Sequence, residues 1–286
     1  GYLFMGGGGV LALIGLFGFE AGMIFNDYVD RDLDKRDVET NAYLHYWRPF
    51  NSRPLSTGAL APQTALLLAG LCALAALVLI ATLGMPCALY VAGIMAYAYG
   101  MEYFYQVKKR HQRFPAAQLL GRTDFALFPV AGYLCAGQPD LQALLYFVFF
   151  YPLALTHLGL NDLGDARNDE ARHLATVPVL YGVPGTVRWI AGFSLLHAAA
   201  SIPFITLFDS LARFGILAGL ALLAVANYIV LSGQAASAGR AAQVRPGTTG
   251  CGADAMPERA VRALPFFHAA MLTYLLSIFA DFFVSL

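Results

Sequence analysis

Long apolar stretches alternate with short polar connections along this chain of 286 residues. Residues 1–25, 61–107, 125–160 and 263–286 each contain a single charged side chain. Turn-forming residues at 84–86 and 137–140 divide two of these stretches into pairs. Because roughly 20 apolar residues cross a hydrocarbon core of ~30 Å, each part is long enough to span a membrane. The pattern predicts eight membrane helices, at about residues 1–25, 61–83, 86–107, 115–137, 141–161, 186–207, 212–233 and 263–285.

The composition excludes an ordinary soluble domain. Hydrophobic residues make up 58% of the chain and charged residues only 13%, with a mean hydropathy of +0.60. A soluble domain carries about 25% charged residues. We therefore expect an all-α, polytopic transmembrane bundle.

The basic residues are distributed on one side of the predicted helices. Of the 18 Lys and Arg residues, all but Arg213 lie in alternate connections, at 31–53, 108–122, 167–188 and 240–262. Cytoplasmic loops of membrane proteins are enriched in Lys and Arg. These four connections are therefore expected to face the cytoplasm.

Two copies of the pattern Asn-x-x-x-Asp-x-x-x-Asp follow apolar stretches. The first is Asn26, Asp30 and Asp34, and the second, about 135 residues later, is Asn161, Asp165 and Asp169. A spacing of four keeps three side chains on one face of a helix, drifting by about 40° per step. The alternative is a solvated loop with compensating charges, but the helical spacing and the repetition argue against it.

Carboxylate and amide oxygens are ligands that suit Mg²⁺, which also binds through substrate phosphates. Two such strips facing each other would hold divalent cations with a phosphate ester between them. The pattern therefore predicts an integral membrane enzyme of diphosphate chemistry with both acidic motifs on the cytoplasmic side.

Three basic residues are candidates for contacting the diphosphate: Lys108, Arg53 and Arg31. Arg binds phosphate in a bidentate manner and stays charged, so it acts as a permanent anion clamp. For the cluster at 108–113 the alternative is an interfacial belt of aromatic residues and topology-setting charges. We choose Lys108 because it is nearest the predicted span.

Other polar residues are expected to be structural. Glu20 and Glu102 lie inside predicted spans, where a carboxylate needs a partner, and Glu102 is expected to snorkel or pair with a neighbouring Lys. Asp162 lies off the strip and is expected to cap or pair. His157 is expected to be a packed, hydrogen-bonded side chain. The four cysteines show no metal-type spacing and are expected to form no disulfide, and the three in predicted spans, Cys72, Cys87 and Cys135, are expected to be small apolar fillers.

The motifs resemble those of the UbiA superfamily of intramembrane aromatic and polyprenyl prenyltransferases. NDYVDRDLD followed by SRPLSTG looks like the first signature, NDLGDARND looks like the second, and residues 105–121 resemble the segment between two central helices. The resemblance implies nine helices around a central cavity that opens sideways to lipid. It also implies Mg²⁺ as cofactor and a polyprenyl diphosphate as donor.

Carried onto this sequence, the resemblance assigns roles to individual residues. Its metal ligands would be Asn26, Asp30, Asp34, Asp165 and Asp169. Its substrate-binding residues would be Arg31, Arg53, Lys108 and Asn161, and its catalytic residues would be Asp30, Asp165 and Lys108.

Some features depart from the family pattern. Eight spans instead of nine lead us to expect one transmembrane domain over residues 1–286 that lacks the first helix. Leu158 stands near a point where the family often has an acid, and residues 43–48 form an insertion. Residues 234–257 are expected to be a flexible cytoplasmic loop.

The predicted function is Mg²⁺-dependent transfer of a prenyl group to a small acceptor, with aromatic compounds among the candidates, and with release of diphosphate. The partners are then the donor, the acceptor and the lipid bilayer, and we expect no nucleic acid. A terpene cyclase of the same fold, a membrane phosphatidyltransferase and a divalent-cation or lipid carrier are the alternatives. Carriers typically place such acids near the bilayer midplane, whereas these acids lie at one face. No residue selects the acceptor or the length of the prenyl chain.

Overall fold

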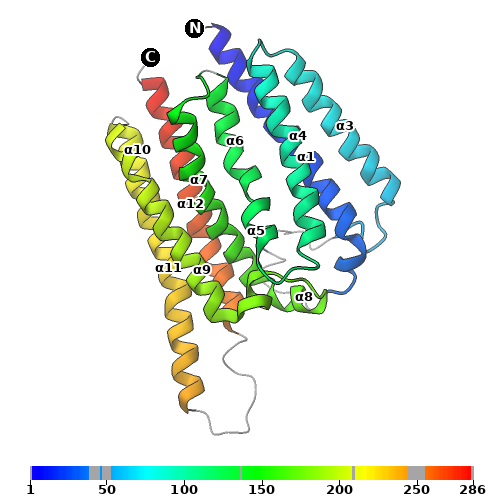
Figure 1. The fold of residues 1–286 in the computed structure, drawn as a ribbon, viewed down its shortest axis with the longest axis vertical. Helices are drawn as coiled ribbons and strands as arrows, with labels where there is room; N and C mark the ends of the chain where they lie inside the picture. Colours follow the sequence, from blue (N-terminus) through cyan, green and yellow to red (C-terminus); the bar gives the residue numbers. More distant parts are fainter. Residues whose placement is uncertain are drawn as a thin grey trace. The chain divides into compact units, whose positions relative to one another are not determined.

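The computed structural model of this protein describes residues 2–38, 46, 53–135, 137–207, 210–243 and 255–284. These residues are helical or in turns and contain no strand (Figure 1). The prediction of an all-α fold is therefore confirmed. The chain forms two compact units, of which the first takes in Gly1–Val38, Asn51–Tyr151 and Ala171–Leu174, and the second the remaining ranges.

The first unit is built from helices that pack along the chain order. They are α1 (Tyr2–Asp34), α3 (Pro62–Ala81), α4 (Cys87–Lys108), α5 (Ala116–Gly121), α6 (Thr123–Leu134) and the first part of α7 (Leu141–Gly164). Helix α1 packs against α3 and α4, and α4 packs against α5 and α6. Ile14, Ile80 and Val91 form a small apolar core between α1, α3 and α4. The acidic motif at the end of α1 is thereby placed beside the end of α4.

The predicted span over 115–137 is interrupted. Helix α5 ends at Gly121, and Arg122 separates it from α6. The guanidinium of Arg122 lies 4.7 Å from the ring centre of Tyr105 and 4.9 Å from that of Phe125. Stacking on two aromatic rings allows a charged residue to stay at this break.

The opposite end of α4 carries a disulfide that we did not predict. Cys87, the first residue of α4, is bonded to Cys135, which follows α6. The expectation that these cysteines are only apolar fillers was wrong, because helix packing brings together two residues 48 positions apart. Spacing along the chain gives no sign of such a contact.

Helix α7 begins after a capping residue. Asp140 accepts hydrogen bonds from the backbone N–H groups of Gln142 and Ala143, at 2.9 and 3.1 Å. The Ala143 N–H is the main cause that lowers the pKa of the Asp140 carboxyl below its usual value. This side chain thus satisfies N–H groups that a helix start leaves without partners.

The second unit contains the end of α7 from Pro152, most of α8 (Ala166–Ala171), and four further helices. These are α9 (Val177–Ala200), α10 (Ile202–Leu207), α11 (Ser210–Gln243) and α12 (Ala255–Val284). Helices α11 and α12 pack against each other over much of their length, and α9 packs against α11. Gly215 and Gly219 of α11 lie directly against Ser277 and Tyr274 of α12, so this face leaves no space for larger residues.

Helix boundaries differ from the predictions in two places of the second unit. Helix α9 begins at Val177 instead of 186, with a change of direction at Gly182, whose φ is +65°. Helix α11 continues through residues 234–243, so the predicted loop begins later. Residues 244–254 lie outside the described residues, and their flexibility stays a prediction.

Six helices are long and apolar enough to cross a membrane among the described residues: Gly9–Asp34, Pro62–Ala81, Leu141–Gly164, Val177–Thr206, Ser210–Ala236 and Met256–Ala280. The predicted count of eight spans is therefore not confirmed. The segment 86–107 forms the more polar helix α4, and 115–137 forms the short helices α5 and α6. The chain is nonetheless a multi-pass membrane protein by the length and composition of its helices.

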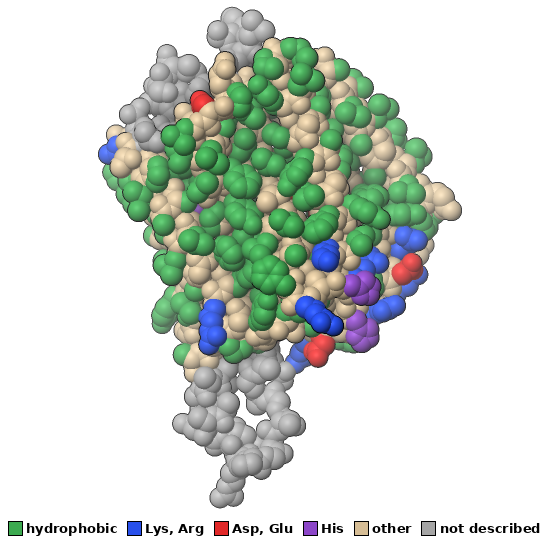
Figure 2. Space-filling model, in the orientation of Figure 1, with side chains coloured by type: hydrophobic (Ala, Val, Ile, Leu, Met, Phe, Trp, Pro, Cys, Tyr) green, Lys and Arg blue, Asp and Glu red, His purple; other side chains and the backbone are tan. Residues whose placement is uncertain are grey.

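The surface agrees with contact to lipid. Helix α3 exposes Leu67, Leu71, Leu74 and Val78, and hydrophobic side chains cover most of the face shown in Figure 2. Basic and histidine side chains gather at the lower right of this view, at the end of the first unit where α1 and α4 end. This charged end contains the first acidic motif.

Candidate functional site

The first acidic motif lies on a single helix, as its spacing predicts. Asn26, Asp30 and Asp34 belong to the last turns of α1, which ends at Asp34. Asp30 and Asp34 are only 5% and 8% exposed. Because buried carboxylates are costly unless they are paired, their partners decide what this site can do.

Helix α4 presents a polar strip to this motif. Asn26 donates a hydrogen bond from Nδ2 to Glu102 Oε1 at 2.7 Å, and Gln106 Nε2 donates to the same oxygen at 2.6 Å. The expectation that Glu102 snorkels or pairs with a Lys is corrected, because its partners are two amides. Asn26, a predicted metal ligand, is thus held by Glu102 in this structure.

Asp30 is paired with two cations that follow the polar strip. Lys109 Nζ lies 2.7 Å from Asp30 Oδ2, and Arg110 Nη2 lies 3.1 Å from Oδ1. Lys109 is 6% exposed, whereas Lys108 is exposed and lines a separate cavity. A helix turns by about 100° per residue, so neighbouring lysines point in different directions. The role of Lys108 in binding diphosphate stays a prediction.

Asp34 and Asp37 share two arginines. Arg53 forms ion pairs with Asp34 and, at 3.4 Å, with Asp37. Arg172 Nη2 lies 2.5 Å from Asp37 Oδ1 and 3.4 Å from Asp34 Oδ1. The predicted cation Arg53 is therefore at the motif, and Arg172 is a further cation that sequence reasoning missed.

We call Asp30, Asp34 and Asp37 with Lys109, Arg110, Arg53 and Arg172 the charged cluster. It combines three carboxylates with four cations, so its formal charge is one positive. The cluster is built within one unit at the end of apolar helices. Such an arrangement can accept an anion, because the cations already lie close together in a partly dry environment.

Arg31 lies apart from the charged cluster. Its guanidinium is 4.4 Å from the ring centre of Tyr28, and Nη1 donates to the Tyr28 carbonyl at 2.6 Å. Its Nη2 atom lies 3.8 Å from the carboxylate oxygen Oδ2 of Asp32. Its predicted contact with a diphosphate is neither supported nor opposed by this position.

The second acidic motif lies in the second unit. Helix α7 ends at Gly164 and α8 begins at Ala166, but helical backbone hydrogen bonds continue from Asp165 N to Asn161 O at 3.0 Å and from Asp169 N to Asp165 O at 2.9 Å. The predicted helical register is therefore kept through the motif. Asp165 and Asp169 are 7% and 5% exposed, and Asn168 donates to Asp165 Oδ1 at 2.8 Å.

Asp162 follows the first residue of this motif and lies off its strip. Its Oδ2 accepts from the backbone N–H of Val177, at 3.4 Å. Val177 is the first residue of α9, so Asp162 caps that helix as predicted.

A chain of polar side chains ends at Asn161. Tyr46 Oη lies 2.6 Å from His268 Nδ1, His268 Nε2 lies 3.0 Å from His157 Nε2, and Asn161 Nδ2 lies 3.2 Å from the same His157 atom. Burial raises the pKa of Tyr46, which favours its role as donor. When Tyr46 donates to His268, His268 Nε2–H donates to His157 Nε2, and the amide N–H of Asn161 shares the single lone pair of that nitrogen. The side-chain oxygen of Asn161 is then directed away from His157.

The donor types suit Mg²⁺. No group of three or more His, Cys, Asp and Glu side chains that could hold a metal occurs among the residues that the structure describes. Magnesium in phosphoryl sites uses one or two carboxylates and completes its coordination with water and substrate phosphates. Asp30 and Asp34 offer such carboxylates beside cations for the phosphate, so these residues fit the group.

Part of this site had a signal in the sequence. Glu102, Gln106 and Lys109 follow each other at steps of four and three, which places them on one helical face. This polar strip on α4 could have indicated Lys109 instead of Lys108. Arg172 and Asp37 had no such signal, because their contact depends on how the connections fold.

The helices and clusters define a multi-pass, all-α membrane protein with buried carboxylates and cations at helix ends. The UbiA prenyltransferase family matches residues 6–244, and the chain belongs to this family. Two solved UbiA homologues share the fold. That from Aeropyrum pernix K1 has a TM-score of 0.65 and 15% identity, covering 93% of this chain and 88% of the homologue. That from Archaeoglobus fulgidus, solved with DMAPP and Mg²⁺, has a TM-score of 0.61 and 16% identity, covering 93% and 86%.

The chain is also similar to proteins named protoheme IX farnesyltransferase. The one from Yersinia enterocolitica is 27% identical over 198 residues, which cover 67% of this chain and 62% of that protein. The one from Citrobacter koseri is 26% identical over 184 residues, covering 64% and 57%. This chain thus spans about three fifths of the length of these relatives.

Proposed function

We propose that this chain is a Mg²⁺-dependent prenyltransferase that ionises a polyprenyl diphosphate and transfers the prenyl group to a small acceptor. The observation that carries the proposal is the charged cluster, in which buried carboxylates and four cations meet at the end of apolar helices. Family membership and a homologue solved with DMAPP and Mg²⁺ support it. The names of the relatives favour a farnesyl donor and a tetrapyrrole acceptor.

The cations of the cluster bind and orient the diphosphate in this proposal. Without donor, Lys109, Arg110, Arg53 and Arg172 neutralise Asp30, Asp34 and Asp37. When the donor binds, these cations exchange some of their hydrogen bonds with the carboxylates for hydrogen bonds with the phosphate oxygens. Asp30 and Asp34 in the first unit would hold Mg²⁺, as would Asp165 and Asp169 in the second unit, and the metal would supply further charge neutralisation.

The reaction breaks the allylic C–O bond, and its electron pair leaves with the diphosphate. Preorganised cations stabilise the negative charge that develops on this leaving group. An electron-rich carbon of the acceptor then forms the new C–C bond with the allylic cation, and the cationic adduct loses a proton to give the neutral product. Apolar walls exclude water, which would otherwise capture the cation. Asn161, oriented through His157, binds substrate beside the second motif.

The test uses purified protein in lipid with farnesyl diphosphate, Mg²⁺ and protoheme, and identifies products by mass. We expect a prenylated acceptor together with released diphosphate, and neither product after chelation of the metal. Diphosphate release with a hydrocarbon product and an unchanged acceptor would replace the transferase with a cyclase. Folded protein that binds donor but releases no diphosphate with any acceptor would contradict enzymatic function.

A further inference from the structure

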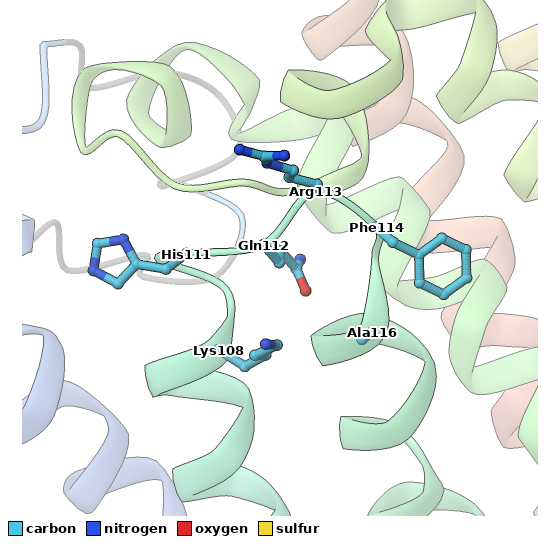
Figure 3. Close-up of a pocket in the computed structure, with 6 residues that line it drawn as sticks. All are labelled: Lys108, His111, Gln112, Arg113, Phe114 and Ala116. Carbon is cyan, nitrogen blue, oxygen red and sulfur yellow. The ribbon is translucent and has the colours of Figure 1, made fainter.

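The connection between α4 and α5 divides its basic residues between two sites. Lys109 and Arg110 contact Asp30 in the charged cluster. Lys108, His111 and Arg113 instead line a cavity of about 640 Å³, together with Gln112, Phe114 and Ala116. Figure 3 shows Lys108 and Gln112 facing the space between the end of α4 and the start of α5, while His111 and Phe114 diverge on either side.

No ion pair in the described part of the chain compensates the positive charge of Lys108 and Arg113 in this cavity. No acidic residue occurs between Glu102 and Asp124 in the sequence. Among the described residues, no ion pair involves Lys108 or Arg113, whereas all four cations of the charged cluster are paired. Two exposed cations and a histidine that share one cavity favour an anionic ligand.

The cavity wall is held in place by an amide network. Gln112 Nε2 donates to Gln118 Oε1 at 2.6 Å, and Gln112 Oε1 accepts from the backbone N–H of Ala117 at 2.9 Å. Gln118 is fully buried, so it anchors this connection to the start of α5. The backbone that carries Lys108 and Arg113 is therefore preformed, which lowers the entropic cost of binding.

Exposed apolar side chains border the cavity in the sequence. Tyr103, Val107, Phe114 and Leu120 are 58%, 46%, 60% and 53% exposed. Tyr103 and Val107 lie at the end of α4, Phe114 lies in the basic connection, and Leu120 lies in α5. A ligand with an anionic head and an apolar tail matches this combination of surfaces.

We propose that the cavity binds the phosphate headgroup of an anionic phospholipid. Lys108 contacts the phosphate, Arg113 points to the other side of the connection in Figure 3 and adds positive charge, and the acyl chains lie along the apolar residues at the end of α4. The cavity recognises a phosphate attached to an apolar tail. A prenyl diphosphate donor has the same chemistry as a phospholipid in this respect, so the experiments must distinguish the two. This proposal is based on the cavity and its lining residues, and it holds whether or not the protein transfers prenyl groups.

The first experiment measures lipid retention by native mass spectrometry, with phosphatidylglycerol and phosphatidylcholine as probes. The test variant is K108Q/R113Q, and the matched control R188Q/R262Q removes two exposed cations elsewhere. We expect wild type and control to retain phosphatidylglycerol at least about tenfold better than phosphatidylcholine, and the test variant to lose this preference. Equal preference in all three proteins would overturn the proposal.

The second experiment uses unmodified protein and a photoactivatable phosphatidylglycerol. We expect adducts on residues 103–120 that persist in excess farnesyl diphosphate. Adducts confined to other segments would contradict the lipid site. This result does not depend on whether K108Q/R113Q folds, because the experiment uses unmodified protein. Loss of the adducts on adding farnesyl diphosphate would instead assign the cavity to the donor, as predicted for Lys108 from the sequence.

Discussion

At the scale of single residues, a shift of one position along α4 separates a buried cation from an exposed one. Lys109 shares a face with the buried residues Tyr105 and Gln106, whereas Lys108 follows the exposed Val107. The sequence predicted Asp30 and Asp34 of the cluster, because Asn and Asp at steps of four leave few alternatives, and it also predicted Arg53. It did not predict Lys109, because aromatic and apolar residues on several faces of α4 hide which face is buried.

Substituting these two lysines tests the ion pair directly. In K109M, Asp30 keeps only Arg110 as a partner, so we expect a loss of about 3 kcal/mol in the free energy of unfolding. K108M changes an exposed side chain, so we expect the free energy of unfolding to change by less than about 0.5 kcal/mol. Thermal unfolding of both variants in the same lipid or detergent gives the comparison. Equal shifts would show that the Asp30–Lys109 pair does not contribute as described.

At the scale of elements, the contact between α11 and α12 depends on small residues. Tyr274 is fully buried, lies against Gly219 and is 3.1 Å from His197 Nε2. It therefore cannot move aside without losing a buried hydrogen bond. We expect G219A to destabilise the protein by about 1–3 kcal/mol through overpacking.

Gly70 provides the matched control in α3, because a Cβ there would meet no atom within 4 Å. Alanine favours a helix over glycine by up to about 1 kcal/mol, so G70A should keep or raise the unfolding temperature. Measuring both variants by thermal unfolding separates packing from helix propensity. A stabilising G219A would contradict the close contact.

The positions of helices were largely predictable, and their interruptions were not. Apolar runs between polar connections located every long helix, because burial in lipid needs a continuous apolar stretch. The break at Arg122 was missed since stacking on Tyr105 and Phe125 keeps a charge within an apparent span. The early start of α9 was missed because Gly182 and Pro184 resemble a loop in sequence.

At the scale of the whole chain, the disulfide bears on the proposed orientation. Helix α4 starts at Cys87 and ends at Lys108, so the disulfide and the basic connection lie at opposite ends of this helix. Disulfides persist mainly in oxidising compartments, whereas Lys and Arg favour the cytoplasmic side. Both signals support a first acidic motif that faces the cytoplasm.

Labelling of the cysteines in intact cells tests this orientation. In a variant with Cys72 and Cys251 replaced by Ser, a membrane-impermeant maleimide should modify Cys87 and Cys135 only after external reduction. If Cys87 and Cys135 were labelled only after the cells had been permeabilised, the orientation of the protein in the membrane would be the reverse of the proposed one. Absence of any disulfide, with both thiols reactive before reduction, would remove this support for it.

The central claim, that both acidic motifs serve diphosphate chemistry, is tested most directly by Mg²⁺-dependent release of diphosphate from farnesyl diphosphate. The variants are D30N and D169N, each with a neighbour off its strip as control, D32N and E170Q. We predict that D30N and D169N lose at least about a hundredfold in rate, because each substitution removes a carboxylate that would hold the Mg²⁺ neutralising the leaving charge. The controls should stay near wild type. Release that is unaffected in D30N and D169N, or equally reduced in all four folded variants, would contradict the account.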